Sequence, residues 1–114
     1  MPLVAIDLPR TMYDANADAV SAGLTQALAD ALGEPAEETI QIFTPYDDTN
    51  PPTRFAGGAG GDVIVGITLA RRYSYDDKQE LYKQVLVQLG RVGLDPSSVH
   101  IPLTENNDYD WSAH

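Results

Sequence analysis

An internal repeat with a period of 61 residues is the feature that most constrains the fold of this chain. Shifting the first half by this period aligns apolar residues with apolar residues, namely Leu3 with Ile64, Val4 with Val65, Ile6 with Ile67, Leu8 with Leu69, Leu24 with Val85, Leu28 with Leu89 and Ile40 with Ile101. Apolar agreement alone is weak evidence, because any two β-α-β units share it. The same shift also aligns Arg10 with Arg71 and Pro35 with Pro96 without a gap. We therefore interpret the chain as one structural unit used twice.

Each half has the hydrophobic pattern of a strand, a helix and a second strand. We expect strands over residues 3–8, 39–43, 62–69 and 99–103, and helices over 14–32 and from Ser74 onward. Apolar residues at intervals of three and four indicate the helices. Gly33 and Pro35 end the first helix, and Asp77 completes a capping box with Ser74 at the start of the second. Pro102 places the last strand at a sheet edge, since proline has no N–H to donate to a central ladder.

The segment between the halves is typical of a loop. Residues 45–61 contain paired prolines, an Asn-Pro step and a glycine cluster. We expect a single domain over residues 1–114, with halves of about 2–44 and 62–104 joined by this loop. The cluster GGAGG is not a phosphate-binding loop, because no Gly-Lys-Ser/Thr follows it.

The repeat also predicts the arrangement of the strands. Each half gives two parallel strands joined by a right-handed helical crossover. A pseudo-twofold axis between the halves gives an α+β fold, in which a four-stranded mixed sheet of order 2-1-3-4 carries both helices on one face. The other sheet face is then apolar and uncovered, so we expect it to pack against copies of the same chain. Because the central strands are antiparallel, Pro2 at the start of the first lies near Arg71 at the end of the third.

Composition narrows the class of protein. Seventeen acidic against seven basic residues give a net charge of −10, which disfavours nucleic acid and anionic membrane as partners. No apolar run approaches the roughly 20 residues that span a bilayer. The chain has no cysteine, and His100 and His114 lack the spacing of a metal site. We expect a cytoplasmic protein with no bound metal.

Pro2 is the first candidate for chemistry. Removal of Met1 would leave proline with a secondary amine, and such a group can act as a general base or a general acid. A free α-amino group titrates near about 8, and burial among cations lowers that value. The alternative is that Pro2 merely begins a strand whose first N–H is not needed.

Other candidates follow the strands. Arg71 and Arg72, with Tyr73 beside them, come directly after the third predicted strand, where guanidinium groups can hold a carboxylate; a surface ion pair is the alternative. Glu38 precedes the second strand and can orient a water or take a proton, although acids there are commonly only surface groups. Trp111 in the tail can wall a pocket or cover core.

Three segments together resemble the tautomerase superfamily, most closely its malonate semialdehyde decarboxylase-like branch. PLVAIDLPR at residues 2–10 resembles the opening strand, TLARRYSYDDKQELYK at 68–83 the third strand and its helix, and ENNDYDWS at 105–112 the tail. The resemblance implies a homotrimer with sites between subunits, a catalytic N-terminal proline at Pro2 and no cofactor. It further implies that Arg71 binds substrate, that Glu38 replaces a water-positioning aspartate and that Trp111 lies near the pocket. Tyr73 stands where the decarboxylase has a second arginine, unless Arg72 takes over that role.

These residues leave several functions open. We rank first a cofactor-independent tautomerase acting on a small 2-oxo or enol carboxylate, because the second arginine is missing. A malonate semialdehyde-type decarboxylase and a haloacrylate hydratase or dehalogenase, in which Glu38 directs a water, use the same site. If Met1 is retained, Pro2 is an amide without a basic nitrogen, and the chain would be a non-catalytic trimeric binding protein.

Overall fold

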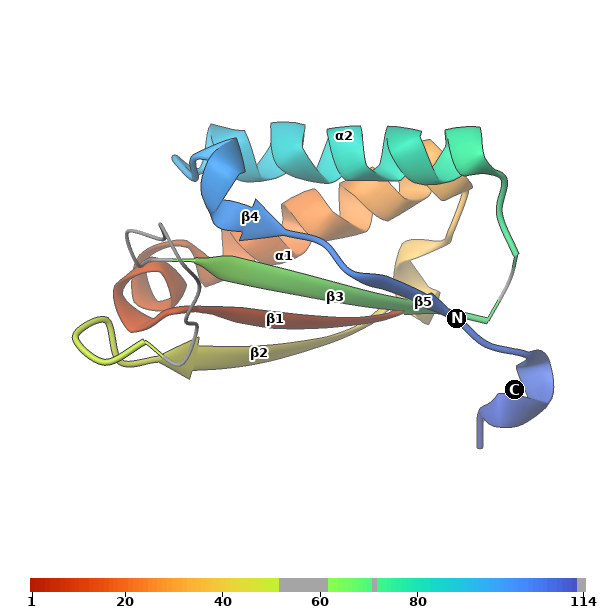
Figure 1. The fold of residues 1–114 in the computed structure, drawn as a ribbon, viewed down its shortest axis with the longest axis horizontal. Coiled ribbons are helices and arrows are strands. Elements are labelled where there is room, and N and C mark those ends of the chain that lie inside the picture. Colours follow the sequence, from red (N-terminus) through yellow and green to blue (C-terminus); the bar gives the residue numbers. More distant parts are fainter. Residues whose placement is uncertain (52–61, 71, 113–114) are drawn as a thin grey trace.

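The computed structural model describes residues 1–51, 62–70 and 72–112. Its strands are β1 (Leu3–Pro9), β2 (Ile40–Tyr46), β3 (Val63–Leu69), β4 (Val99–His100) and β5 (Leu103–Glu105). Its helices are α1 (Arg10–Leu32) and α2 (Tyr75–Arg91), with three 3₁₀ turns, η1 (Ala36–Glu38), η2 (Pro96–Ser98) and η3 (Asp108–Asp110). The two α-helices lie side by side over one face of the sheet, which confirms the predicted α+β fold with both helices on one face (Figure 1).

The sheet has the predicted strand order. Its path is β2-β1-β3-β4, and β5 pairs with β3. β1 runs parallel to β2, with Leu3 opposite Ile40, and antiparallel to β3, with Leu3 opposite Thr68. The start of β1 therefore lies between the start of β2 and the end of β3.

The fourth predicted strand is interrupted. We expected it over residues 99–103, but the structure has β4 and β5 with a break at Ile101 and Pro102. Pro102 has no N–H, although its carbonyl still accepts a hydrogen bond from Ile67 at 2.9 Å. The register against β3 is the same on both sides of the break, since Val63 pairs with Val99 and Ile67 with Leu103. Proline thus removes part of the ladder without shifting the strand.

Helix α1 begins four residues earlier than the predicted residue 14, directly after β1. The residue before it, Pro9, stands at the N-cap and offers no side-chain hydrogen bond. Asp48, from the loop after β2, instead accepts hydrogen bonds from the backbone N–H of Thr11 at 3.2 Å and from its hydroxyl. The Thr11 hydroxyl holds the pKa of Asp48 below its ordinary value. At the other end, Gly33 has φ +68° as the αL cap, which glycine adopts without steric cost.

The core lies between the helices and one sheet face. It contains alternate residues of β1 and β3 together with Leu24 and Leu28 of α1 and Leu81, Val85 and Leu89 of α2. The opposite sheet face leaves Ile40 43% and Ile42 50% exposed. This uncovered apolar face is the one the repeat predicted. No helix in the described part of the chain is long and apolar enough to cross a membrane.

Candidate active site

Pro2 lies at the buried start of β1. Its carbonyl accepts a hydrogen bond of 3.0 Å from the backbone N–H of Ile40, so it already belongs to the β1–β2 ladder. Extending both registers by one residue places Pro2 between Thr39 on the β2 side and Leu69 on the β3 side. Because side chains alternate along a strand, Pro2 shares the helix-covered face with Val4, which is fully buried.

The β2 side of Pro2 carries a hydroxyl and a carboxylate. Thr39 belongs to the same helix-covered face as Pro2, since Ile40 projects from the opposite one. Within the described residues, the buried Thr39 Oγ1 has no hydrogen-bond partner. Glu38, the last residue of η1, is exposed and lies one residue further from the ladder. The structure therefore brings Glu38 to the same end of the sheet as Pro2.

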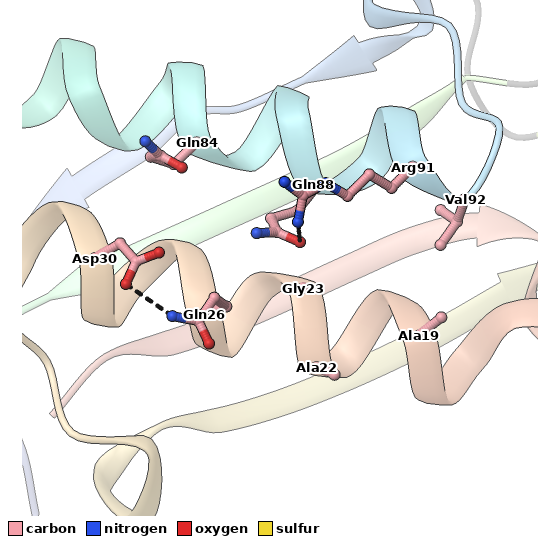
Figure 2. Close-up of a pocket in the computed structure, with 9 residues that line it drawn as sticks. All are labelled: Ala19, Ala22, Gly23, Gln26, Asp30, Gln84, Gln88, Arg91 and Val92. Atoms are coloured by element: carbon pink, nitrogen blue, oxygen red, sulfur yellow. Dashed lines mark hydrogen bonds between the residues drawn. The ribbon is translucent and has the colours of Figure 1, made fainter.

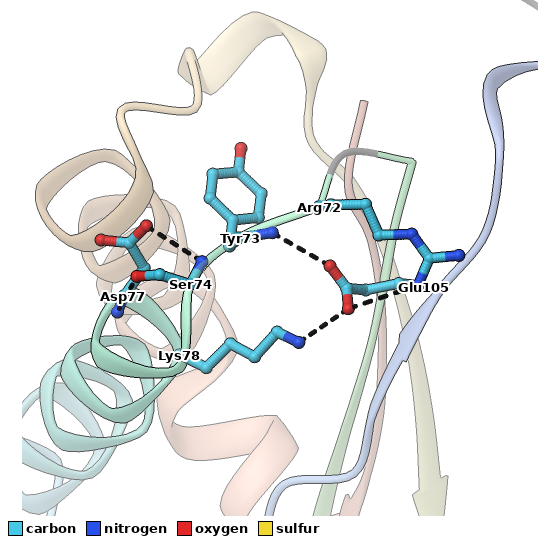
Figure 3. Close-up of polar contacts among 6 residues, drawn as sticks. All are labelled: Arg72, Tyr73, Ser74, Asp77, Lys78 and Glu105. Carbon is cyan, nitrogen blue, oxygen red and sulfur yellow. Dashed lines mark hydrogen bonds and ion pairs between the residues drawn. The ribbon is translucent and has the colours of Figure 1, made fainter.

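The β3 side of Pro2 leads into the turn before α2, where one carboxylate accepts two hydrogen bonds and forms an ion pair with Arg72 (Figure 3). Glu105, the last residue of β5, accepts from Lys78 Nζ at 2.7 Å and from the Tyr73 backbone N–H at 3.1 Å. The guanidinium of Arg72 lies 3.7 Å from the same carboxylate. The hydrogen bond from Lys78, with the Tyr73 N–H and the positive charges of Lys78 and Arg72, holds the pKa of Glu105 below its ordinary value. The capping box of Ser74 and Asp77 then begins the helix.

The side chain of Tyr73 points away from Glu105 toward the loop after α1 (Figure 3). Its hydroxyl donates a hydrogen bond to the carboxyl group of Glu34, which is only 3% exposed. Tyr73 is thus bound at two points by two different carboxyl groups, one at its backbone and one at its ring. A phenol has a single O–H, so while Tyr73 donates its hydrogen bond to Glu34 it cannot also donate one to a bound anion.

The tail returns to the same end of the sheet, where the N-terminus and the C-terminal segment lie near one another (Figure 1). The backbone N–H of Asn106 donates to the Leu69 carbonyl at 2.9 Å, which extends the β3–β5 ladder beside Pro2. The side-chain carbonyl of Asn106 accepts from Trp111 Nε1 at 2.5 Å. Trp111 is therefore bound to the residue that directly follows β5.

The second half of the repeat does not reproduce this arrangement. A shift of 61 residues places Val63 on Pro2 and His100 on Thr39. His100 Nε2 lies 3.2 Å from the buried carboxylate of Asp62. Valine within a chain has no amine to titrate, so the opposite end of the sheet lacks the group that defines the candidate site.

A groove of about 620 Å³ lies between α1 and α2, and Pro2 is not among the residues that line it (Figure 2). Its polar side chains bond within their own helices, as Gln26 does to Asp30 at 2.7 Å and Arg91 to Gln88 at 3.5 Å. Gly23 at its floor meets Gln88 so closely that an added Cβ would lie 3.0 Å from that residue. The groove therefore reflects close helix packing and has no group arranged for catalysis.

Of the predicted site residues, the structure places Pro2, Glu38, Arg72, Tyr73 and Trp111 at one end of the molecule, whereas Arg71 lies outside the described residues. The sequence reasoning gave no role to Glu105, Glu34, Thr39 and Lys78. A sequence signal for Glu105 was present, because an acid at the end of the edge strand that pairs with β3 lies next to the turn with the arginines. Glu34 had none, since an acid between Gly33 and Pro35 reads as surface loop.

The comparisons with known proteins agree with this fold. A family model described as a tautomerase enzyme matches residues 38–114. A malonate semialdehyde decarboxylase inhibited by 3-bromopropiolate is 28% identical at a TM-score of 0.80, over 98% of this chain and 88% of that one. No curated protein gives a significant match.

Two further solved structures share the fold at lower identity. A wild-type fused 4-OT asymmetric trimer has a TM-score of 0.84 at 20% identity, over 96% of this chain and 90% of that one. A member of the cis-3-chloroacrylic acid dehalogenase family has a TM-score of 0.84 at 20% identity, over 98% and 80%. Since the family model covers more than half of the sequence, the chain belongs to the tautomerase superfamily of enzymes.

Proposed function

We propose that this enzyme is a cofactor-independent tautomerase acting on a small 2-oxo or enol carboxylate, with Pro2 as its acid and base once Met1 is removed. The observation that carries the proposal is the position of Pro2. It lies buried at the start of β1, beside Thr39 and Leu69, at the sheet end where the cationic side chains of Arg72 and Lys78 gather.

Proton transfer accounts for the whole reaction. The neutral Pro2 amine takes the proton from the enol hydroxyl, and the ammonium then delivers a proton to the neighbouring carbon. The enol O–H bond breaks and a C–H bond forms, while the C=C bond becomes single and the C–O bond becomes a carbonyl, so composition does not change. Burial and nearby cations both favour the neutral amine, which is the form that the first step requires.

Binding of the substrate needs a positive patch in a strongly acidic chain. With a net charge of −10, the protein repels a carboxylate except where its few cations are concentrated. Arg71 and Arg72 bind the substrate carboxylate, Glu38 orients a water or a hydroxyl at the β2 side, and Tyr73 and Trp111 border the pocket. We place this reaction in the cytoplasm, as composition predicted.

Self-association completes the proposal. We propose a homotrimer, in which the face bearing Ile40 and Ile42 packs against neighbouring copies. These isoleucine side chains are about half exposed, and burying their apolar surface between subunits contributes roughly 25 cal/mol of free energy per Å². The fused 4-OT structure with the same fold is described as a trimer, which supports this stoichiometry.

A second candidate activity is decarboxylation of a malonate semialdehyde-type acid. It is favoured by 28% identity over nearly the whole chain to a malonate semialdehyde decarboxylase. In that reaction, protonated Pro2 polarises the carbonyl while the arginines orient the carboxylate that leaves as CO₂. Tyr73 argues against decarboxylation, because it replaces the second arginine with a neutral side chain. Its hydroxyl donates a hydrogen bond to Glu34.

One substrate panel tests the proposal. An enol pyruvate, malonate semialdehyde and a haloacrylate are incubated with the wild-type enzyme and with Pro2→Ala. We expect ketonisation of the enol at a kcat/KM at least 100-fold above that of the variant. Faster turnover of malonate semialdehyde or of the haloacrylate would favour the decarboxylase or the dehalogenase. No turnover of any substrate would support a non-catalytic binding protein.

A further inference from the structure

We propose that Glu105 is a positioning residue, which holds the turn between β3 and α2 in the conformation that binds the substrate carboxylate. The inference rests on the proposed function and goes beyond it, because it assigns a role to a residue on a different strand. The turn comprises residues 70–74, of which the structure describes Ala70, Arg72, Tyr73 and Ser74.

The contacts of Glu105 join three elements (Figure 3). From β5, its carboxylate reaches the backbone N–H of Tyr73 in the turn and Nζ of Lys78 in α2. Its side chain is 11% exposed, whereas that of Arg72, at 3.7 Å, is 69% exposed. Glu105 is thus held in place while the guanidinium beside it stays open to a ligand.

Strand pairing connects this contact to Pro2. Glu105 lies opposite Leu69, the last residue of β3, and Leu69 falls beside Pro2 in the next ladder. Two strand spacings therefore separate Glu105 from Pro2, which is about 10 Å. This spacing separates the two backbones, and the carboxylate of Glu105 bonds to Lys78 and to the Tyr73 N–H. Glu105 therefore acts on the reaction through the turn and through its charge.

Two other contacts of the described part of the turn act at different atoms. The Ser74 capping box fixes the first turn of α2, and Glu34 binds the ring hydroxyl of Tyr73. Neither contact reaches the backbone N–H of Tyr73. Glu105 supplies that acceptor, and it does so from the same sheet that carries Pro2. It therefore fixes the distance between the turn and the catalytic amine.

Positioning and simple electrostatics predict opposite results. If Glu105 only neutralised cations, its removal would make the site more positive and would lower the KM for an anionic substrate. If Glu105 positions the turn, its removal raises KM although a negative charge has gone. The direction of the change in KM thus separates the two roles.

The experiment compares Glu105→Ala, Glu105→Gln and the control Glu80→Gln, which removes one charge from an acid on α2 that accepts from Gln84 in the same helix. For the enol substrate, we expect KM to rise at least fivefold in Glu105→Ala. In Glu105→Gln, which keeps an acceptor for Tyr73, we expect a rise of two- to threefold. Glu80→Gln is expected to match the wild type.

A second readout does not depend on catalysis. Hydrogen exchange at the Tyr73 amide, followed by NMR, is expected to be at least tenfold faster in Glu105→Ala, and pyruvate binding at least threefold weaker. An inactive wild type would defeat the proposed function, and these two measurements would then decide the positioning role alone. A lowered or unchanged KM, or unchanged exchange at Tyr73, would overturn it. If Glu105→Ala does not fold, Glu105→Gln decides by the same criteria.

Discussion

Removal of the Tyr73 hydroxyl tests how this end of the molecule is held together. That hydroxyl donates to Glu34, a carboxyl group only 3% exposed, so Tyr73→Phe leaves a buried acceptor without this donor. A hydrogen bond to such a group contributes about 2 kcal/mol. At about 2.1 cal/mol/K per residue, the unfolding entropy of the 114-residue chain is roughly 240 cal/mol/K. The expected loss therefore lowers the melting temperature by about 8 °C.

The matched control is Tyr75→Phe, which makes the same chemical change two residues away on a side chain that is 75% exposed. We expect it to shift the melting temperature by less than 2 °C. Both variants are melted by circular dichroism at equal protein concentration, because self-association makes melting concentration-dependent. If Tyr73→Phe melts within 2 °C of Tyr75→Phe, the bond to Glu34 does not stabilise the native state and the reasoning is refuted.

Three further outcomes are expected. Thr39→Val replaces a buried hydroxyl that has no hydrogen-bond partner in the described part of the chain, so the free energy of unfolding should be unchanged or rise by up to about 1 kcal/mol. If the hydroxyl contacts the substrate, kcat/KM falls in this variant. An equal kcat/KM would show that it does not contact the substrate. Ile42→Asp places a charge on the uncovered sheet face, and light scattering should detect monomers of this variant. Val87→Asp, at a similarly exposed site on α2, should leave the oligomer intact. Dissociation of both variants or of neither would contradict the proposed interface. The contacts of Glu105, above all the hydrogen bond from Lys78, lower the pKa of its carboxyl group in the folded protein. The ionised carboxylate therefore stabilises the fold at pH values above the ordinary glutamate pKa. This contribution is lost as the pH falls through the lower pKa of the folded state. The stability difference between wild type and Glu105→Gln, from urea unfolding, should therefore shrink as the pH falls below the ordinary glutamate pKa of about 4.3. A difference that grows on acidification would contradict this sign.

The sequence was sufficient for the sheet order and for the uncovered face. Both depend on the repeat, which fixes two β-α-β units, and on apolar alternation, which fixes the buried side of β1 and β3. The capping box at Ser74 and the αL cap at Gly33 were also predicted, because each is encoded within a few residues.

Features that depend on distant residues were not predicted. Helix α1 begins at Arg10 because Asp48, 37 residues away from Thr11, provides the acceptor that Pro9 lacks. Local patterns contain no information about that pairing. The same holds for the candidate site, where Glu105 meets Lys78 and Tyr73 only after β5 has paired with β3.

The resemblance implied roles for Pro2, Arg71 and Trp111. It also placed Tyr73 at the position of the decarboxylase's second substrate-binding arginine. Its bond to Glu34 instead makes it part of the framework of the site. A local reading of the sequence could not show this, since Glu34 is acidic and flanked by Gly33 and Pro35, which indicate exposure.

The state of the N-terminus tests the central claim most directly. The native protein is analysed by intact mass, then treated with 3-bromopropiolate over a range of pH and mapped by peptide mass spectrometry. The account predicts a chain without Met1 and a single adduct on Pro2, formed with an apparent pKa near or below about 7. An apparent pKa well above that value would favour the decarboxylase. Retention of Met1 would contradict the account, because acylated Pro2 has no basic nitrogen.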